Sequence, residues 1–311
     1  MNDARQRTGL LLALAAAVVS GVAVYVNGEA VGRFSSPTVY TTGKNLVAGI
    51  VLVAVALAWP RRSSTSTVST GHRSSQERFG LAAVAVIGGA VPFVLFFEGL
   101  ARATSSDAAF LHKTLIIWVA LLAVSLLGER LTMLHVGAVA LLIIGQIALA
   151  DGLGSLRPGV GEAMVLAATL CWAVELIVVK RLVDTVPPTT VGAARIGGGA
   201  VLLITWLAIT GRVADLMSLS TTQWAWLALT GSILSVFVTL WFAAVARAQV
   251  TDVAAVLVPG AVITGLIRLA AGGTVAPIQI VGWVLMITAV AALVARQSAV
   301  GVGRRSIEAA A

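Results

Sequence analysis

The sequence predicts an all-α integral membrane protein with ten transmembrane helices arranged as two inverted five-helix repeats. Three observations lead to this prediction. Hydrophobic residues make up 59% of the 311-residue chain and charged residues only 11%, whereas soluble domains carry roughly 25% charged residues. Ten apolar runs are long enough to cross a bilayer, and the second half of the chain repeats features of the first. A chain this apolar needs lipid as its solvent.

The predicted spans follow from length, since a helix rises about 1.5 Å per residue and about 20 apolar residues cross the hydrocarbon core. In the first half the runs of this length are residues 8–28, 37–59, 80–100, 104–126 and 132–150. In the second half they are residues 161–180, 188–210, 224–244, 251–271 and 277–295. The first run could pass for a signal peptide, but its apolar core is too long and more spans follow. We therefore expect a retained first helix.

Two sets of matching residues reveal the duplication. Late in each half, a shift of 145 residues superposes five pairs without a gap: Ala101 on Ala246, Arg102 on Arg247, Asp107 on Asp252, Gly128 on Gly273 and Gly137 on Gly282. Earlier in each half, a shift of 151 residues places Pro37 on Pro188 and Lys44 on Arg195. Because each half has an odd number of spans, the second half must enter the membrane in the opposite orientation, as in an inverted repeat. We therefore expect a first repeat over 1–150, a second over 151–300 and a cytoplasmic tail over 301–311.

The lysines and arginines predict the orientation. With the N-terminus in the cytoplasm, 13 of the 21 basic residues fall on the inner side and four on the outer side, as the positive-inside rule requires. We therefore expect a multi-pass protein of a bacterial-type inner cell membrane with both termini cytoplasmic. The net charge of +8 does not indicate nucleic-acid binding, because the charges lie in short gaps between apolar runs. The single cysteine, Cys171, excludes an internal disulfide and a cysteine-based zinc cluster.

Several of these residues also carry a family resemblance. Each half has a proline and a basic residue early in its second span, and Gly128 to Thr132 read Gly-Glu-Arg-Leu-Thr before the fifth span. In these features the chain resembles the EamA-type branch of the drug/metabolite transporter superfamily. The second copy, residues 273–277, reads Gly-Thr-Val-Ala-Pro and lacks the acid and the base. The resemblance implies a ten-helix fold with a central cavity between the halves and the fifth and tenth helices outside its wall. It also implies movement of small metabolites, amino acids or drugs, often outward.

Ionisable residues inside the spans are the main candidates for function, because each costs at least about 2.5–3.5 kcal/mol at the bilayer centre. Seven such residues matter here: Lys44, Glu98, His112, Lys113, Glu175, Arg195 and Arg268. Lys44 and Arg195 are symmetry mates, which favours a structural role for both. Four others have no charged counterpart in the opposite half and are better candidates for substrate binding or translocation: Glu98, His112, Lys113 and Glu175. The bases outnumber the acids, which favours a substrate with a carboxylate or other anionic group.

The two acids each allow two interpretations. Glu98 lies at the depth of Lys44 and Lys113, so an ion pair and a site for a proton or a substrate amine are equally open. Glu175 lies deep in the sixth span at the level of Arg195, and we expect these two to pair.

The remaining polar candidates differ in their expected surroundings. His112 could relay protons, since histidine titrates near neutrality, but a hydrogen-bonded helix contact is the commoner role of a buried histidine. We expect Lys113 to face the cavity between the halves. Arg268 lies near the outer end of the ninth span, and we expect its side chain to reach the membrane surface.

Aromatic residues add further candidates for the substrate site. Trp172 and Trp241 lie within spans and could stack on a flat solute or fill packing gaps. Trp172 also occupies a position where the resembled family often has an aromatic residue. Tyr25 and Asn27 lie toward the outer end of the first span.

The sequence predicts a secondary transporter, with export of small metabolites such as amino acids by alternating access. No P-loop, His-Glu-x-x-His, Cys-x-x-Cys or Gly-x-Ser-x-Gly motif occurs. We therefore expect no direct use of ATP, no cofactor, no metal and no enzymatic activity. The expected partners are a small-molecule substrate and the lipid bilayer; proton coupling, facilitated diffusion and a homodimer are all open. The alternatives are an integral-membrane enzyme acting on a lipid or polyprenyl substrate and a membrane scaffold without transport.

Overall fold

The computed structural model describes residues 3–58, 74–103, 105–149 and 159–308, and every regular element in these ranges is a helix. Within them, nine helical segments are long and apolar enough to cross a membrane. The fifth expected span is the apolar helix α7 (Met133–Leu149), which has 17 residues. The all-helical architecture with several spans is confirmed. The count of ten crossings is not confirmed, because α7 is shorter than the nine other segments. The segment 59–73 between the second and third expected spans lies outside the described residues, as do residues 309–311 of the expected tail.

The first half begins with two uninterrupted helices, α1 (Asp3–Val31) and α2 (Pro37–Ala58). Pro37 occupies the first position of α2, where its missing N–H costs no hydrogen bond. The next four helices are α3 (Ser75–Ile87), α4 (Val91–Leu100), α5 (Ser105–Lys113) and α6 (Leu115–Leu127). Ser74 starts α3 through a capping box with Glu77, in which each side chain bonds the other residue's backbone N–H.

The second half follows the same order. Its elements are α8 (Val160–Leu182), α9 (Pro188–Ala193), the π-helical turn η1 (Ala194–Gly198), α10 (Gly199–Ile209), α11 (Val213–Met217), α12 (Thr221–Val245), α13 (Val250–Leu257), α14 (Gly260–Ala270) and α15 (Pro277–Glu308). Ser220 and Gln223 form a second capping box at the start of α12. The last helix continues through residue 308, so the described part of the expected tail is helical.

Three predicted spans are each split into two helices. The third divides between α3 and α4, the fourth at Thr114, and the ninth at Val258 and Pro259. Thr114 and Pro259 are related by the 145-residue shift, so both repeats break their fourth helix at the same position. Pro259 explains its own break, because it has no N–H to donate. Discontinuous helices at matching positions are typical of inverted-repeat transporters, where they mark the level of binding sites.

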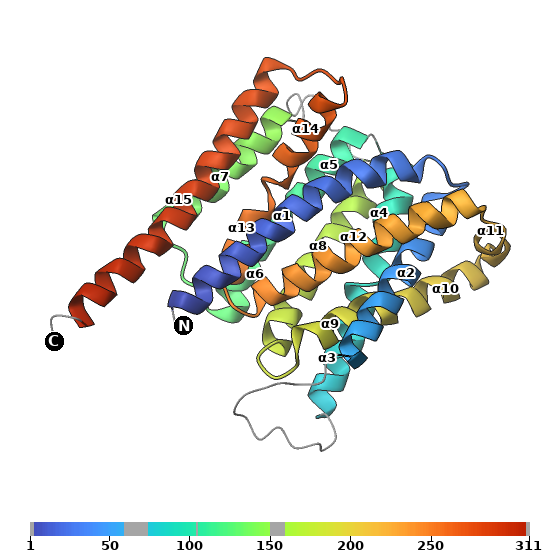
Figure 1. Cartoon of the computed structure of the whole chain (residues 1–311), viewed down its shortest axis with the longest axis horizontal. Coiled ribbons are helices and arrows are strands. Elements are labelled where there is room, and N and C mark those ends of the chain that lie inside the picture. Colours follow the sequence, from blue (N-terminus) through green and yellow to red (C-terminus); the bar gives the residue numbers. More distant parts are fainter. Residues whose placement is uncertain (1–2, 59–73, 104, 150–158, 309–311) are drawn as a thin grey trace.

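Helices from the two halves lie side by side (Figure 1). The middle of the view is occupied by α1 and α12, and α7 runs along α15 at one edge. This edge pair is close: a Cβ atom at Gly145 would lie 2.8 Å from the Gly282 carbonyl oxygen, and one at Gly282 would lie 2.6 Å from that of Gly145.

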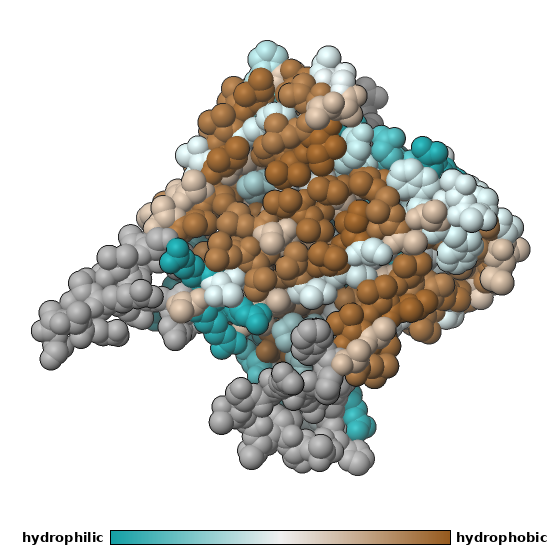
Figure 2. All heavy atoms as spheres, in the orientation of Figure 1, coloured by the Kyte–Doolittle hydropathy of each residue, from teal (hydrophilic) through white to brown (hydrophobic). Residues whose placement is uncertain are grey.

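The outer surface of the helices is apolar. Figure 2 shows a broad hydrophobic face over α1, α12 and α15. Leu11, Val236 and Val284 are among the large apolar side chains exposed on these helices. Exposed apolar patches of this extent are rare on soluble monomers and mark contact with lipid or protein. Because α1 begins and α15 ends on the same side of the molecule (Figure 1), we call this side the N-terminal side and the opposite one the far side.

Candidate functional site

A buried polar face on α2 is the centre of the candidate site. It consists of Thr38, Thr41, Lys44 and Asn45, which are between 0% and 6% exposed. Residues three, four and seven apart share one side of a helix, so the sequence places these four side chains together. Burial of this many polar groups in an apolar chain is costly unless each group finds a partner.

Lys44 is held by an amide oxygen and two aromatic rings. Its Nζ donates to Oδ1 of Asn27 at 3.4 Å, and the Tyr40 hydroxyl donates to the same oxygen. The ammonium also lies 5.2 Å from the ring centre of Tyr40 and 5.7 Å from that of Phe97. Among the described residues, no carboxylate lies within 4 Å of Lys44. The Lys44 cation therefore has polar and aromatic contacts but no counter-ion in the described part of the chain.

Two neighbours of Lys44 on this face have unused hydrogen-bonding capacity. Neither polar atom of the Asn45 amide has a hydrogen-bond partner among the described residues, and the same is true of the Thr41 hydroxyl. Buried polar atoms without partners are rare in folded proteins, and each one calls for a functional or solvent explanation. The α2 polar face therefore offers a solute a hydrogen-bond donor, a hydrogen-bond acceptor and a positive charge.

Glu98 forms an ion pair, as one of its two interpretations predicted, but its partner is Arg102 and not Lys44 or Lys113. The Thr38 hydroxyl donates to one Glu98 carboxylate oxygen at 2.9 Å, and Arg102 donates to the other at 2.8 Å. Arg102 lies one helical turn further along the chain and is half-exposed. An arginine so placed reaches the carboxylate more easily than a lysine on another helix.

Glu175 and Arg195 form the buried ion pair that the sequence predicted, with 2.9 Å between Oε1 and Nε. Arg195 lies in the π-helical turn η1, 5.8 Å from the ring centre of Phe242. The 145-residue shift relates Phe97 to Phe242, so each half holds its basic residue against an equivalent phenylalanine. The halves differ in charge balance, because Arg195 has a carboxylate partner and Lys44 has none among the residues that the structure describes.

An aromatic cluster lies between these two basic residues. It consists of Phe93, Phe96, Phe97, His112 and Trp172, whose neighbouring ring centres lie 5.0–5.6 Å apart. The Trp172 indole donates to the Gly88 carbonyl at 3.1 Å. A Cβ atom at Gly88 would lie 2.6 Å from Cγ of Glu175. Contacts therefore run without a gap from Lys44 through the aromatic cluster to the Glu175–Arg195 pair.

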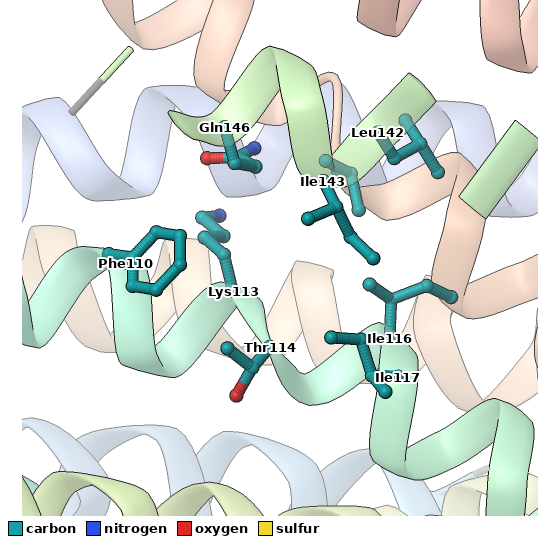
Figure 3. Close-up of a pocket in the computed structure, with 9 residues that line it drawn as sticks. Phe110, Lys113, Thr114, Ile116, Ile117, Leu142, Ile143 and Gln146 are labelled. Carbon is teal, nitrogen blue, oxygen red and sulfur yellow. The ribbon is translucent and has the colours of Figure 1, made fainter. Parts of the chain in front are cut away.

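The other candidates from the sequence lie apart from these contacts between Lys44 and the Glu175–Arg195 pair. Lys113 lines a small cavity beside α7 (Figure 3), and Val258 of the second repeat lines it too. The expected position of Lys113 facing the passage between the halves stays a prediction. Trp241 is buried and stacks on Phe237, with ring centres 5.9 Å apart. Arg268 is exposed near the end of α14, as expected for a side chain that reaches the membrane surface. Tyr25 makes no hydrogen bond to another described residue of the site.

The sequence prediction missed Thr41 and Asn45 and the aromatic partners of Lys44. The spacing of Thr41, Lys44 and Asn45 on one helix face was a usable signal, because their counterparts in the second repeat are Gly192, Arg195 and Ile196. The ring contacts could not be found in this way, since phenylalanines in an apolar span usually face lipid or fill the core.

Polar contacts join the two halves on the N-terminal side. The backbone N–H groups of Val250 and Thr251 donate to Glu129 at 2.7 and 3.2 Å, and the Thr251 hydroxyl donates at 2.8 Å. His135 lies 3.2 Å from Asp252 in a buried pair. Glu129 belongs to the Gly-Glu-Arg-Leu-Thr segment, so this acid of the first repeat caps α13 of the second.

Replacing Glu129 with alanine should lower the free energy of unfolding by about 1–2 kcal/mol, the usual cost of losing a helix cap. The change leaves the first N–H groups of α13 without their acceptor. Hydrogen exchange of the peptide that contains Val250 and Thr251 should therefore become faster. Arg130→Ala is the matched control, because Arg130 is exposed and makes no hydrogen bond to a described residue. Equal exchange in both variants would contradict a capping role.

Two apolar helical repeats that pack together around buried charged residues are typical of a membrane transporter. The chain belongs to the EamA-like transporter family, which matches residues 7–150 and 159–295. One match in each half fits an inverted repeat. None of the curated proteins matches the chain. A crystal structure described only as that of a protein superposes with a TM-score of 0.74, is 18% identical, and is matched over 91% of this chain and 97% of the other. At this identity the similarity shows the fold alone.

Proposed function

We propose that this protein is a secondary transporter that exports small metabolites bearing a carboxylate, such as amino acids or related compounds. It crosses a bacterial-type inner membrane ten times, with α7 as the fifth span and both termini in the cytoplasm. Membership of a transporter family supports the transport activity. No observation on the described residues favours an enzyme or a scaffold.

The observation that carries the substrate class is the Lys44 cation without a counter-ion. A cation buried away from water is stabilised chiefly by an opposite charge. Within the described ranges, the contacts of the Lys44 ammonium are the Asn27 amide oxygen and two aromatic rings. A substrate carboxylate supplies the missing charge. The free amide atoms of Asn45 and the Thr41 hydroxyl then offer hydrogen bonds to the polar groups next to that carboxylate.

Alternating access explains how the solute passes the aromatic cluster. Glu129 and the His135–Asp252 pair join the two repeats on the N-terminal side, and we propose that Lys44 exchanges solute with the far side while they are joined. Opening the N-terminal side requires the first repeat to release α13. Proton coupling through His112 and facilitated diffusion both fit this arrangement.

Counterflow into proteoliposomes tests the proposal. A panel of amino acids, other carboxylates, neutral solutes and organic cations is offered to the purified chain. We expect saturable flux for carboxylate compounds and a loss of at least about tenfold in Lys44→Met, equivalent to roughly 1.4 kcal/mol of lost binding or transition-state stabilisation. Lys44→Arg should retain part of the flux.

Two controls separate lost binding from lost folding. Arg268→Met removes an exposed positive charge from the same membrane protein and should leave flux unchanged. Thermal unfolding of Lys44→Met in detergent should match that of the wild type. Flux of cations alone, or full carboxylate flux in Lys44→Met, would contradict the proposed substrate class.

A further inference from the structure

A buried histidine–aspartate pair connects the two repeats on the N-terminal side. His135 lies in the first turn of α7 and Asp252 in the first turn of α13, with 3.2 Å between Nε2 and Oδ1. Their side chains are only 6% and 2% exposed. Gln6 of α1 donates an amide N–H to the other Asp252 carboxylate oxygen at 3.2 Å. Three helices therefore meet at one pair of ionisable side chains.

The contacts of the His135 ring determine where its proton lies. The backbone N–H of Thr132 donates to Nδ1 at 3.1 Å, and the Thr132 hydroxyl oxygen lies 2.8 Å from the same nitrogen. Because a backbone N–H can only donate, Nδ1 carries no proton, and the ring proton is on Nε2 next to Asp252. The ring is therefore neutral while this contact exists. His135 occupies the position that glutamate has in a capping box, three residues after the threonine that precedes α7.

A second proton on the ring would break this cap. With Nδ1 protonated, two N–H groups would face each other, and the Thr132 N–H would lose its acceptor. The positive charge would also lie at the N-terminal end of α7, where the helix dipole opposes a cation. Thr132 is separated by only two residues from Glu129, which accepts the first N–H groups of α13. A shift of Thr132 therefore disturbs the cap on α13.

Asp252 acts in the opposite sense, since a carboxylate attracts a protonated ring. Its charge is already stabilised beside the neutral ring, however, by the Gln6 amide and by the N-terminal end of α13. Its attraction for a protonated ring does not depend on Thr132 either. Protonation of His135 therefore weakens the link to Thr132, while the ring can stay next to Asp252.

The other charged side chains at this end of the molecule are engaged with backbone groups or exposed. Arg5 of α1 donates to the Ala246 carbonyl at 2.9 Å, and Glu129 caps α13. Lys180 and Arg181 of α8 and Arg247 after α12 also donate to backbone carbonyls. The exposed ones are Arg7, Arg130 and Asp184.

The remaining helices that pack against α7 and α13 add no charge here. Helices α6 and α12 contain no ionisable residue, and the described side chains of α15 include none. The Lys113 cavity of α5 meets α7 at Gln146, about three turns away from His135. Histidine is thus the side-chain type at this contact that titrates near neutrality.

The positions that match this pair on the far side hold different residues. The 145-residue shift relates His135 to Ile280, Glu129 to Thr274 and Asp252 to Asp107. The second copy therefore keeps the aspartate but has neither the histidine nor the glutamate. A proton can act on the contact at the N-terminal side without a matching effect on the far side.

We propose that His135 is a proton-binding site that controls the separation of the two repeats on the N-terminal side. The neutral ring accepts the Thr132 N–H and holds the repeats together. A proton taken up at Nδ1 breaks this bond, loosens the Glu129 cap and lets α13 move away. The joined arrangement binds one proton fewer than the separated one, so its population falls as the pH falls. This role of His135 rests on the alternating access proposed above.

Hydrogen exchange of the purified full chain in detergent tests this site. The peptide that contains Val250 and Thr251 is followed between about pH 8 and pH 5.5, and its rates are divided by those of an unfolded reference at each pH. Carboxylates of ordinary pKa stay ionised in this range. We expect exchange to become about 5–30 times faster at the acidic end, which is the equivalent of a lost helix cap.

His135→Gln separates the histidine from every other titratable group. The glutamine oxygen can accept the Thr132 N–H and its amide can donate to Asp252, but the side chain takes up no proton in this range. We expect wild-type protection at the alkaline end and no acceleration in acid, whereas His112→Gln should keep the wild-type response. An equal acid response in the wild type and His135→Gln, or greater protection in acid, would overturn the proposal.

Nuclear magnetic resonance of isotope-labelled histidine provides a test that needs no change at His135. The His135 signals are assigned by elimination with His72→Gln and His112→Gln. We expect a ring protonated only on Nε2 at the alkaline end, and a doubly protonated ring over the same pH interval in which Val250 loses protection. A ring that stayed neutral while α13 opened would contradict the proposal. Neither readout needs a solute, so the outcome is independent of whether the protein transports a carboxylate.

Discussion

Gly89→Ala should destabilise the protein by about 3 kcal/mol or more, at the upper end of the cost of overpacking. A Cβ atom at Gly89 would overlap the carbonyl oxygen of Arg195, and one at Gly199 would overlap the carbonyl of Gly89. Both obstacles are backbone atoms, so no side-chain rotation relieves them. Moving them would displace the π-helical turn that carries Arg195. We expect a lower Tm in detergent and a lower yield of folded protein in the membrane.

Two glycines in open positions provide the controls. At Gly28 in α1 and Gly137 in α7, an added Cβ atom would meet no neighbouring atom within 4 Å. Alanine at either site should leave stability unchanged or raise it by up to about 1 kcal/mol, because alanine favours the helix. If Gly89→Ala behaved as these controls do, the close approach of α3 to the π-helical turn would be contradicted.

Arg195→Met should cost about 3–5 kcal/mol of unfolding free energy, since it leaves the buried Glu175 carboxylate without its partner. The two side chains are only 10% and 4% exposed, so solvent cannot replace the lost guanidinium. Adding Glu175→Met should recover much of the loss, because the double variant buries no charge. Unfolding of the two single variants and the double variant forms a double-mutant cycle.

The symmetry mate of Arg195 provides a contrast within the same molecule. Lys44→Met removes a cation that has no carboxylate partner among the described residues, so it leaves no opposite charge buried and unpaired. We expect little change in stability from it. A loss as large as that of Arg195→Met would show that Lys44 has a structural role, which was the expectation from sequence symmetry.

An ion pair could be predicted from the sequence where the depth of the two residues in the membrane is enough to identify the partners. Glu175 and Arg195 lie at the same level of neighbouring spans, and they pair. Glu98 was not predictable from depth, because Arg102 is one turn away on the surface and competes for it. The sequence analysis also missed the helix break at Thr114, since threonine carries no strong helix-breaking signal. The break could be inferred only from Pro259, which occupies the equivalent position in the second repeat.

The role of Glu129 shows why contacts between the halves escape sequence reasoning. Its carboxylate caps a helix that begins 121 residues later. No local pattern relates the two positions, and the second repeat has Thr274 in the place of the acid. The contact exists only when the repeats are packed against one another.

The sequence by itself determined the solvent, the apolar segments and the duplication, because these depend on composition and on residue order along one chain. Tertiary structure decided which base has a carboxylate partner, which cavity Lys113 lines and which residues join the two repeats. Those features depend on how each helix is rotated about its axis and how closely it approaches its neighbours. In this protein, backbone contacts at glycines such as Gly89, Gly145 and Gly199 set the rotation of the helices and the distances between them.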